Sequence, residues 1–130
     1  MENRELIAKA KEAMERAYAP YSHFKVGAAL LAADGTVFTG CNVENATYGA
    51  AICAERTAVT KAVSEGYRTF LKIAITASSG AYTPPCGICR QVLYEFMPEG
   101  EVVLWSETEG ERVFRLDALL PFGFRGEDIK

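Results

Sequence analysis

The sequence has no block of lysine and arginine residues that would mark a surface for a polyanion. It contains 14 lysines and arginines against 17 aspartates and glutamates, so its formal net charge is −3. Proteins that bind nucleic acid or anionic membranes usually carry a basic patch that attracts phosphate groups. We therefore expect neither nucleic acid nor a membrane surface as a partner.

Long hydrophobic runs are also missing. The longest apolar run, residues 26–33, is far shorter than the roughly 18 residues that suggest a membrane span. The first residues follow a charged helical pattern, which differs from the basic, apolar and small-residue order of a secretory leader. We expect a cytoplasmic protein, and because disulfides are rare in that compartment, its four cysteines point to a metal or to catalysis.

Repeats, linkers and low-complexity stretches are absent from the 130 residues, of which 49% are apolar. A chain of this size and composition can form a hydrophobic core without crosslinks. We expect residues 1–130 to form a single domain. The single histidine, His23, is expected in a solvated loop and not at a ligand position.

The spacing of apolar residues predicts helices and strands along the whole chain. Helical spacing covers residues 4–18, 52–65 and 87–97, with Asn3 as the expected cap of the first helix. Strand-like patterns cover residues 25–33, 36–43, 70–77, 102–105 and 112–116, with a hairpin turn at Asp34-Gly35. Two of the strands are apolar on both sides and need a covering layer on each face. The sequence predicts an α/β fold in which helices cover a sheet.

Three cysteines lie at the beginnings of two predicted helices. Cys53 begins one helix, and Cys86 and Cys89 begin the next. A C-x-x-C pair at a helix start puts both sulfurs on one face, where they can share a metal. Three protein ligands with an open fourth position are typical of a catalytic zinc site, which acidifies a water bound there. We expect one zinc ion per chain, held by these three cysteines.

Charged residues lie within three positions after two of the proposed ligands, Cys53 and Cys89. Glu55 is two positions after Cys53, a spacing that does not stack side chains on a helix, so we expect an acid/base beside the metal instead of a ligand. Three thiolates outweigh the charge of Zn²⁺, and the site therefore needs positive groups. The two helix N-termini supply part of this charge. Arg56 and Arg90 are candidates for the rest, although Arg56 could instead pair with a surface carboxylate.

These motifs, in this order and spacing, resemble the small homotetrameric zinc-dependent cytidine deaminases. The resemblance is carried by residues 21–29, 40–46, 53–58 and 85–92 and spans nearly the whole chain. It implies a mixed sheet in an α/β/α arrangement and a homotetramer with shared active sites. It also implies hydrolytic deamination of free cytidine and 2′-deoxycytidine in pyrimidine salvage. In that family a zinc-bound hydroxide attacks C4 of the base, and Glu55 would move the protons.

The resemblance also assigns substrate contacts. Asn42 and Glu44 match residues that bind the ribose 3′-hydroxyl, and their spacing near a strand end puts both on one face. Phe24 matches the aromatic ring that packs on the pyrimidine. The backbone of Ala54 matches the group that holds the base oxygen.

Two further aromatic residues match positions that reach the site from neighbouring subunits. They are Tyr48 and Phe124, and Phe122 could take the place of Phe124. Without the resemblance, these rings and Phe24 would be ordinary core or interface side chains. Pro84 stands where most relatives have serine, so a hydroxyl contact is absent there and only a backbone carbonyl contact to the leaving amino group could remain.

Other functions fit parts of the pattern. Cys86 and Cys89 alone could form a thioredoxin-like redox pair, but this leaves Cys53 unexplained. Cys41 as a fourth ligand would make a structural zinc module, although a buried thiol on its strand is the more common outcome. Deamination of polynucleotides needs a basic channel. Blasticidin deaminases lack the sugar pair that stands here as Asn42 and Glu44.

Overall fold

The structure is a computed structural model that describes residues 1–129, and it contains one five-stranded sheet. The strands are β1 (Val26–Ala32), β2 (Val37–Cys41), β3 (Phe70–Ala77), β4 (Glu101–Ser106) and β5 (Gly110–Arg115). They lie in the order β2-β1-β3-β4-β5. β3 and β4 are parallel, and the other neighbours are antiparallel. The sheet is therefore mixed.

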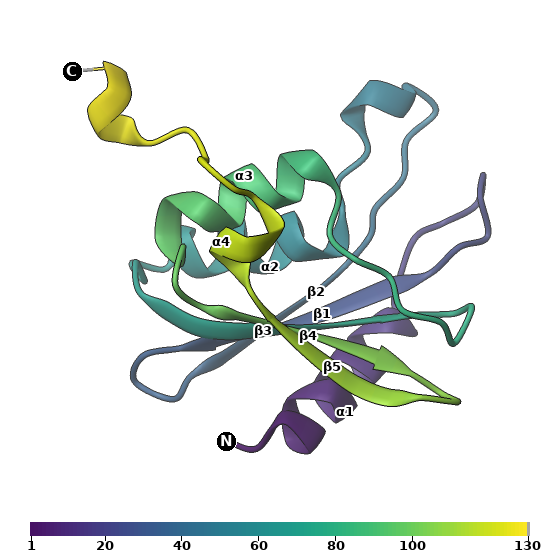
Figure 1. Cartoon of the computed structure of the whole chain (residues 1–130). Helices are drawn as coiled ribbons and strands as arrows, with labels where there is room; N and C mark the ends of the chain where they lie inside the picture. The colour runs from purple at the N-terminus through teal and green to yellow at the C-terminus, as the bar shows by residue number, and fades with distance from the viewer. Residues whose placement is uncertain (130) are drawn as a thin grey trace.

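Helices cover both faces of the sheet (Figure 1). They are α1 (Asn3–Met14), α2 (Ala54–Ser64), α3 (Gly87–Phe96) and the short α4 (Leu116–Leu119), with 3₁₀ turns η1 (Tyr48–Ala50) and η2 (Gly126–Ile129). Helix α1 lies on one face, and α2 and α3 lie on the other. Every residue of β1 is buried, as expected for a strand between two helical layers. The predicted α/β class is confirmed. Within residues 1–129, no helix is long and apolar enough to cross a membrane.

The packing of α2 against the sheet depends on Gly40 in β2. A Cβ atom at this position would lie 2.6 Å from both the Ala54 carbonyl oxygen and the Ala58 nitrogen. Because both atoms belong to the backbone, they cannot move aside as a flexible side chain could. Gly40 therefore permits close approach of the first turn of α2, which begins directly after Cys53.

The first helix is shorter than predicted because the chain after Met14 pairs elsewhere. The Tyr18 nitrogen donates to the Asn42 carbonyl at 3.0 Å, and the Glu44 nitrogen donates to the Tyr18 carbonyl at 2.8 Å. These bonds replace the helical ones and hold residues 42–44 beside Tyr18. β2 ends at Cys41, so Asn42 and Glu44 follow the strand and do not belong to it.

The predicted cap of α1 is wrong. Glu2 occupies the N-cap position and its side chain makes no capping bond, while Asn3 is the first helical residue. The Asn3 side chain instead accepts a hydrogen bond from Lys72 of β3 at 2.7 Å. This contact ties the start of α1 to the sheet, and the sequence pattern around Asn3 contains no sign of it.

Candidate active site

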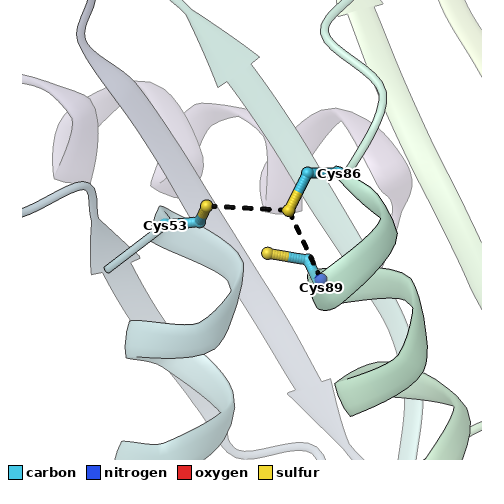
Figure 2. A group of neighbouring side chains, drawn as sticks. All are labelled: Cys53, Cys86 and Cys89. Atoms are coloured by element: carbon cyan, nitrogen blue, oxygen red, sulfur yellow. Dashed lines mark hydrogen bonds between the residues drawn. The ribbon is translucent and has the colours of Figure 1, made fainter. Parts of the chain in front are cut away.

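Three cysteine sulfurs meet where the first turns of α2 and α3 approach each other (Figure 2). The sulfurs of Cys53, Cys86 and Cys89 all lie within 4.8 Å of one another, and those of Cys53 and Cys86 are 3.8 Å apart. Two sulfurs bound to one tetrahedral zinc at about 2.3 Å lie about 3.8 Å apart. The cluster therefore has the donor atoms and the size that zinc requires.

The fourth cysteine lies outside this cluster. Cys41 is half-buried at the end of β2, so the expectation that its thiol is fully buried is wrong. Over residues 1–129, the potential metal ligands that gather together are the three cysteines alone, and all four thiols are free of disulfides. The arrangement matches a three-ligand site better than a closed four-cysteine site or a Cys86–Cys89 redox disulfide.

Two of the sulfurs occupy helix N-cap positions. Cys53 occupies the N-cap position of α2 without a side-chain capping bond, and Cys86 caps α3, where its sulfur accepts the Cys89 backbone N–H at 3.4 Å. A helix N-terminus carries partial positive charge, which stabilises an anion placed there. The fold thus aims two helix dipoles at the same group of thiols.

Arg56 adds a full positive charge to the cluster. Its Nη2 atom donates to the Cys53 sulfur at 3.6 Å and to the Ala51 carbonyl at 3.4 Å. Its Nε atom is buried without a hydrogen-bond partner among residues 1–129. Arg90 is directed elsewhere, since it donates to the carbonyls of Pro85 and Leu119 at 2.7 and 2.8 Å. Of the two candidate arginines, Arg56 is the one in contact with a sulfur.

The pKa values of Cys53 and Cys89 are displaced in opposite directions. Hydrogen bonding with Cys89, helped by Arg56, lowers the pKa of Cys53 to about 5. Hydrogen bonding with Cys53, together with burial, raises the pKa of Cys89 well above its ordinary value. Negative charge therefore collects first on the sulfur that faces Arg56. A bound cation would favour further thiolate charge on the cluster.

Glu55 lies in the first turn of α2, beside the cysteines but outside their cluster. Its side chain is only 5% exposed. Burial is the main reason that the pKa of its carboxyl is raised to about 7, and the negative charge of Cys53 adds to the effect. A carboxyl that titrates near neutral pH can both accept and donate a proton, which acid/base chemistry requires.

The loop that carries Phe24 is held by Asn42 and Glu44. The Asn42 amide donates to the Phe24 carbonyl and accepts from the Val26 nitrogen, each at 2.8 Å. Glu44 accepts the backbone N–H groups of Tyr21 and Ser22 at 3.0 and 3.1 Å. Phe24 itself is 39% exposed, and Glu44 is half-buried. These contacts bring three predicted substrate-binding residues into one network.

A single β-bridge joins this network to the cysteine cluster. Val43, which lies between Asn42 and Glu44, exchanges two backbone hydrogen bonds of 2.9 Å with Ile52. Ile52 directly precedes Cys53, and the fully buried Ala54 follows it as the first residue of α2. The sequence predicted both groups of residues, and the bridge places them side by side.

The remaining predicted aromatic residues point into solvent. Tyr48 is 78% exposed in η1, Phe124 is 56% exposed, and Phe122 is fully exposed. Figure 1 shows η1 and the C-terminal segment extending away from the body of the protein. A hollow of about 310 Å³ beside Glu44 and Tyr48 does not include the cysteines. Among residues 1–129, this hollow therefore does not connect Tyr48 with the cysteine cluster.

The match to a family model identifies the protein family of this chain. Residues 1–105 match the model described as the cytidine and deoxycytidylate deaminase zinc-binding region. This chain belongs to the cytidine deaminase family. The chain is thus a zinc-dependent hydrolase, and the cysteine cluster has the donor atoms that zinc fits.

Individual family members are similar over almost their whole length. The cytidine deaminase of Sporosarcina psychrophila is 47% identical over 130 residues, covering 99% of this chain and 96% of that protein. The crystal structure of the Burkholderia pseudomallei cytidine deaminase has 51% identity and a TM-score of 0.91, covering 95% of this chain and all of the other. The Mycobacterium tuberculosis structure has 42% identity and a TM-score of 0.83, covering 95% and 98%. The predicted family and fold are confirmed.

Two residues in this cytidine deaminase were given no role from the sequence. Ser22 contacts Glu44 through both its backbone and its hydroxyl. Gln91 of α3 forms two bonds with the backbone of Phe124, donating to its carbonyl at 2.8 Å and accepting from its nitrogen at 3.2 Å. Both lie within segments that carry the family resemblance. Their partners are far away in the sequence, so spacing alone could not reveal these contacts.

Proposed function

We propose that this chain deaminates free cytidine and 2′-deoxycytidine to uridine and 2′-deoxyuridine, with release of ammonia, as an enzyme of pyrimidine salvage in the cytoplasm. The observation that carries the proposal is the convergence of three cysteine sulfurs beside a buried carboxyl, Glu55. The relatives described above are named cytidine deaminases, which supports the choice of substrate.

Glu55 is the proposed catalytic residue, and Cys53, Cys86 and Cys89 are the proposed zinc ligands. The bound zinc supplies an acidified water as the nucleophile for C4 of the base. Glu55 takes a proton from the attacking water and passes it to N3 of the base. It then takes the second proton from the hydroxyl now attached to C4 and delivers it to the amino group, which leaves as ammonia while C4 becomes a carbonyl. Its burial suits this role, because a pKa of about 7 makes both protonation states available near neutral pH.

The other proposed contacts hold the nucleoside at its two ends. The backbone of Ala54 holds the base oxygen, and Phe24 packs against the ring. Asn42 and Glu44 bind the 3′-hydroxyl. Both side chains keep capacity for this bond, because an amide has two lone pairs and two hydrogens, and a carboxylate has about four lone-pair sites. A phosphate close to this carboxylate would be repelled, so nucleotides should be poor substrates.

We also propose a homotetramer in which neighbouring subunits complete each site. Tyr48 and Phe124 are the residues that would reach across, and their exposure in the single chain supports this role. Large exposed aromatic side chains are often covered by a partner. Phe122 is even more exposed and is the alternative to Phe124.

The decisive experiment measures ammonia release together with the ultraviolet change from cytosine to uracil. The substrates are cytidine, 2′-deoxycytidine, 2′,3′-dideoxycytidine, free cytosine, CMP and a cytosine-containing DNA strand. We expect rapid turnover of the first two alone. A hydrogen bond from the 3′-hydroxyl to an ionised carboxylate is stronger than one between neutral groups, so its loss in dideoxycytidine should lower kcat/KM by about tenfold or more.

Two outcomes would contradict the proposal. Absence of turnover with cytidine and 2′-deoxycytidine in zinc-loaded protein would reject the substrate class. Equal kcat/KM values for 2′-deoxycytidine and 2′,3′-dideoxycytidine would reject the role given to Asn42 and Glu44. The size of the assembly, measured by analytical ultracentrifugation, tests the tetramer independently of activity.

A further inference from the structure

The loop between α1 and β1 contains a hydroxyl with two directed hydrogen bonds. The Ser22 hydroxyl donates to one oxygen of the Glu44 carboxylate and accepts the Phe24 backbone N–H at 3.0 Å. The direction of each bond follows from chemistry, because an ionised carboxylate cannot donate and an amide N–H cannot accept. Ser22 therefore connects the proposed sugar-binding carboxylate to the residue that carries the proposed base-packing ring.

Further hydrogen bonds hold the same two partners, the Glu44 carboxylate and the backbone of Phe24. The other Glu44 oxygen accepts the backbone N–H groups of Tyr21 and Ser22 at 3.0 and 3.1 Å. The peptide groups of Phe24 are held at both sides, since Ser22 accepts from its nitrogen and Asn42 donates to its carbonyl at 2.8 Å. The side-chain hydrogen bond from Ser22 is also the main reason that the pKa of Glu44 is lowered, with a smaller contribution from His23.

The backbone of the loop is bent to allow this contact. His23, between Ser22 and Phe24, has a φ of 59°, in the left-handed region that non-glycine residues rarely adopt. Its nitrogen donates to the Ala19 carbonyl at 3.0 Å, which closes the turn. A non-glycine residue in this region is strained and persists where the surroundings hold it in place. Here the surroundings include the two hydrogen bonds of the Ser22 hydroxyl, to Glu44 and from the Phe24 backbone N–H.

We propose that Ser22 is a positioning residue. It orients the Glu44 carboxylate toward the 3′-hydroxyl and fixes the position of Phe24 relative to that carboxylate. This inference rests on the proposed function and adds a residue to it. Ser22 is not one of the proposed zinc ligands, and its hydroxyl contacts Glu44 and the Phe24 backbone. Its effect on catalysis passes through Glu44 and Phe24, so removing its hydroxyl should weaken recognition of the sugar more than recognition of the base.

The test compares two substrates that differ in the group Glu44 would bind. For wild type and Ser22→Ala, kcat/KM is measured with 2′-deoxycytidine and with 2′,3′-dideoxycytidine. We expect Ser22→Ala to reduce the ratio of the two values about tenfold, the effect of one hydrogen bond to a charged group. Ser22→Thr keeps a hydroxyl at the same position and should restore most of the ratio.

A matched variant separates this effect from simple loosening of the loop. Ser78→Ala also removes a hydroxyl that accepts a backbone N–H of this loop, from Lys25 at 3.0 Å, but it does not touch Glu44. Ser78→Ala should leave the substrate ratio unchanged. A double variant, Ser22→Ala with Glu44→Ala, should have the same ratio as Glu44→Ala alone, because Ser22 acts through the missing carboxylate.

The outcomes distinguish the two proposals. If wild type prefers 2′-deoxycytidine and Ser22→Ala keeps that preference, the role of Ser22 is rejected and the proposed function stands. The same conclusion follows if Ser22→Ala lowers kcat/KM equally for both substrates, as a merely structural residue would. If wild type shows no preference, the sugar contact of Glu44 fails, and the role of Ser22 fails with it.

Discussion

Replacing Arg56 by glutamine removes the side-chain charge that contacts the cysteine cluster. The bond from Nη2 to the Cys53 sulfur is 3.6 Å long, and hydrogen bonds to charged groups contribute roughly 1.5–3 kcal/mol. Because the acceptor is sulfur and the distance is long, we take the lower end of this range. If the loss appears in the transition state, kcat should fall about tenfold. The acidic limb of the pH profile should also move upward, because the metal becomes a weaker Lewis acid.

The charge argument can be tested without turnover, on metal-free protein. Hydrogen bonding from Cys89, with a contribution from Arg56, lowers the pKa of Cys53 to about 5. Only the thiolate reacts with an alkylating reagent. In wild type, the rate of Cys53 alkylation should therefore rise with a midpoint near this pH. In Arg56→Gln the midpoint should lie higher, because a positive group that favoured the thiolate is gone.

Arg90→Gln is the matched comparison. Arg90 also lies beside a cysteine in the sequence, but it donates to the carbonyls of Pro85 and Leu119. Its replacement should reduce thermal stability without moving the Cys53 midpoint. Zinc content must be measured for each variant, since lost metal would also lower kcat. An Arg56→Gln protein with full zinc, wild-type turnover and an unmoved alkylation midpoint would refute the reasoning.

Three further predictions follow from the site and its support. Native protein should bind one zinc per chain, and the metal should protect three thiols from a labelling reagent but not Cys41, while all four thiols should react after unfolding and zinc removal; protection of all four by metal would contradict the three-ligand site. Glu55→Gln should retain zinc and lose roughly 10²–10⁴-fold in kcat, and near-normal turnover would exclude it as the acid/base. Gly40→Ala should lower the free energy of unfolding by about 1–3 kcal/mol in urea titrations, because its Cβ would be 2.6 Å from backbone atoms of α2. Gly49→Ala, where a Cβ has no neighbour within 4 Å, should be nearly neutral in the same titrations.

Most elements of the fold could be predicted because their signals are local. The apolar run of residues 70–77 matches β3 at both ends, and the Asp34-Gly35 turn joins β1 and β2 as expected. Gly35 has a φ of 95°, which glycine adopts without strain. The spacing of Cys86 and Cys89 likewise places two sulfurs on one helix turn. In each case the information lies within a few residues of the feature it predicts.

The end of the first helix was less predictable, because its backbone groups pair with a segment that is distant in the sequence. The apolar spacing of residues 4–18 is compatible with a helix up to Tyr18, but α1 ends at Met14. Tyr18 pairs with the segment around Val43 instead. Nothing near Tyr18 in the sequence identifies that segment, since the β1–β2 hairpin is what places it beside Tyr18 in the fold.

The sequence by itself determined which residues are the candidates for the chemistry, through the order and spacing of its cysteine, glutamate and asparagine motifs. The tertiary structure alone decided which of them meet. Strands β3 and β4 are parallel neighbours, and the crossover between them places α3 beside α2 with Cys89 near Cys53. The tertiary structure also directed Arg56 to a sulfur and Arg90 to Leu119, although each arginine follows a proposed ligand within three positions in the sequence. Short-range spacing sets the face on which a side chain lies, whereas contacts between distant segments depend on how the sheet and its helices pack.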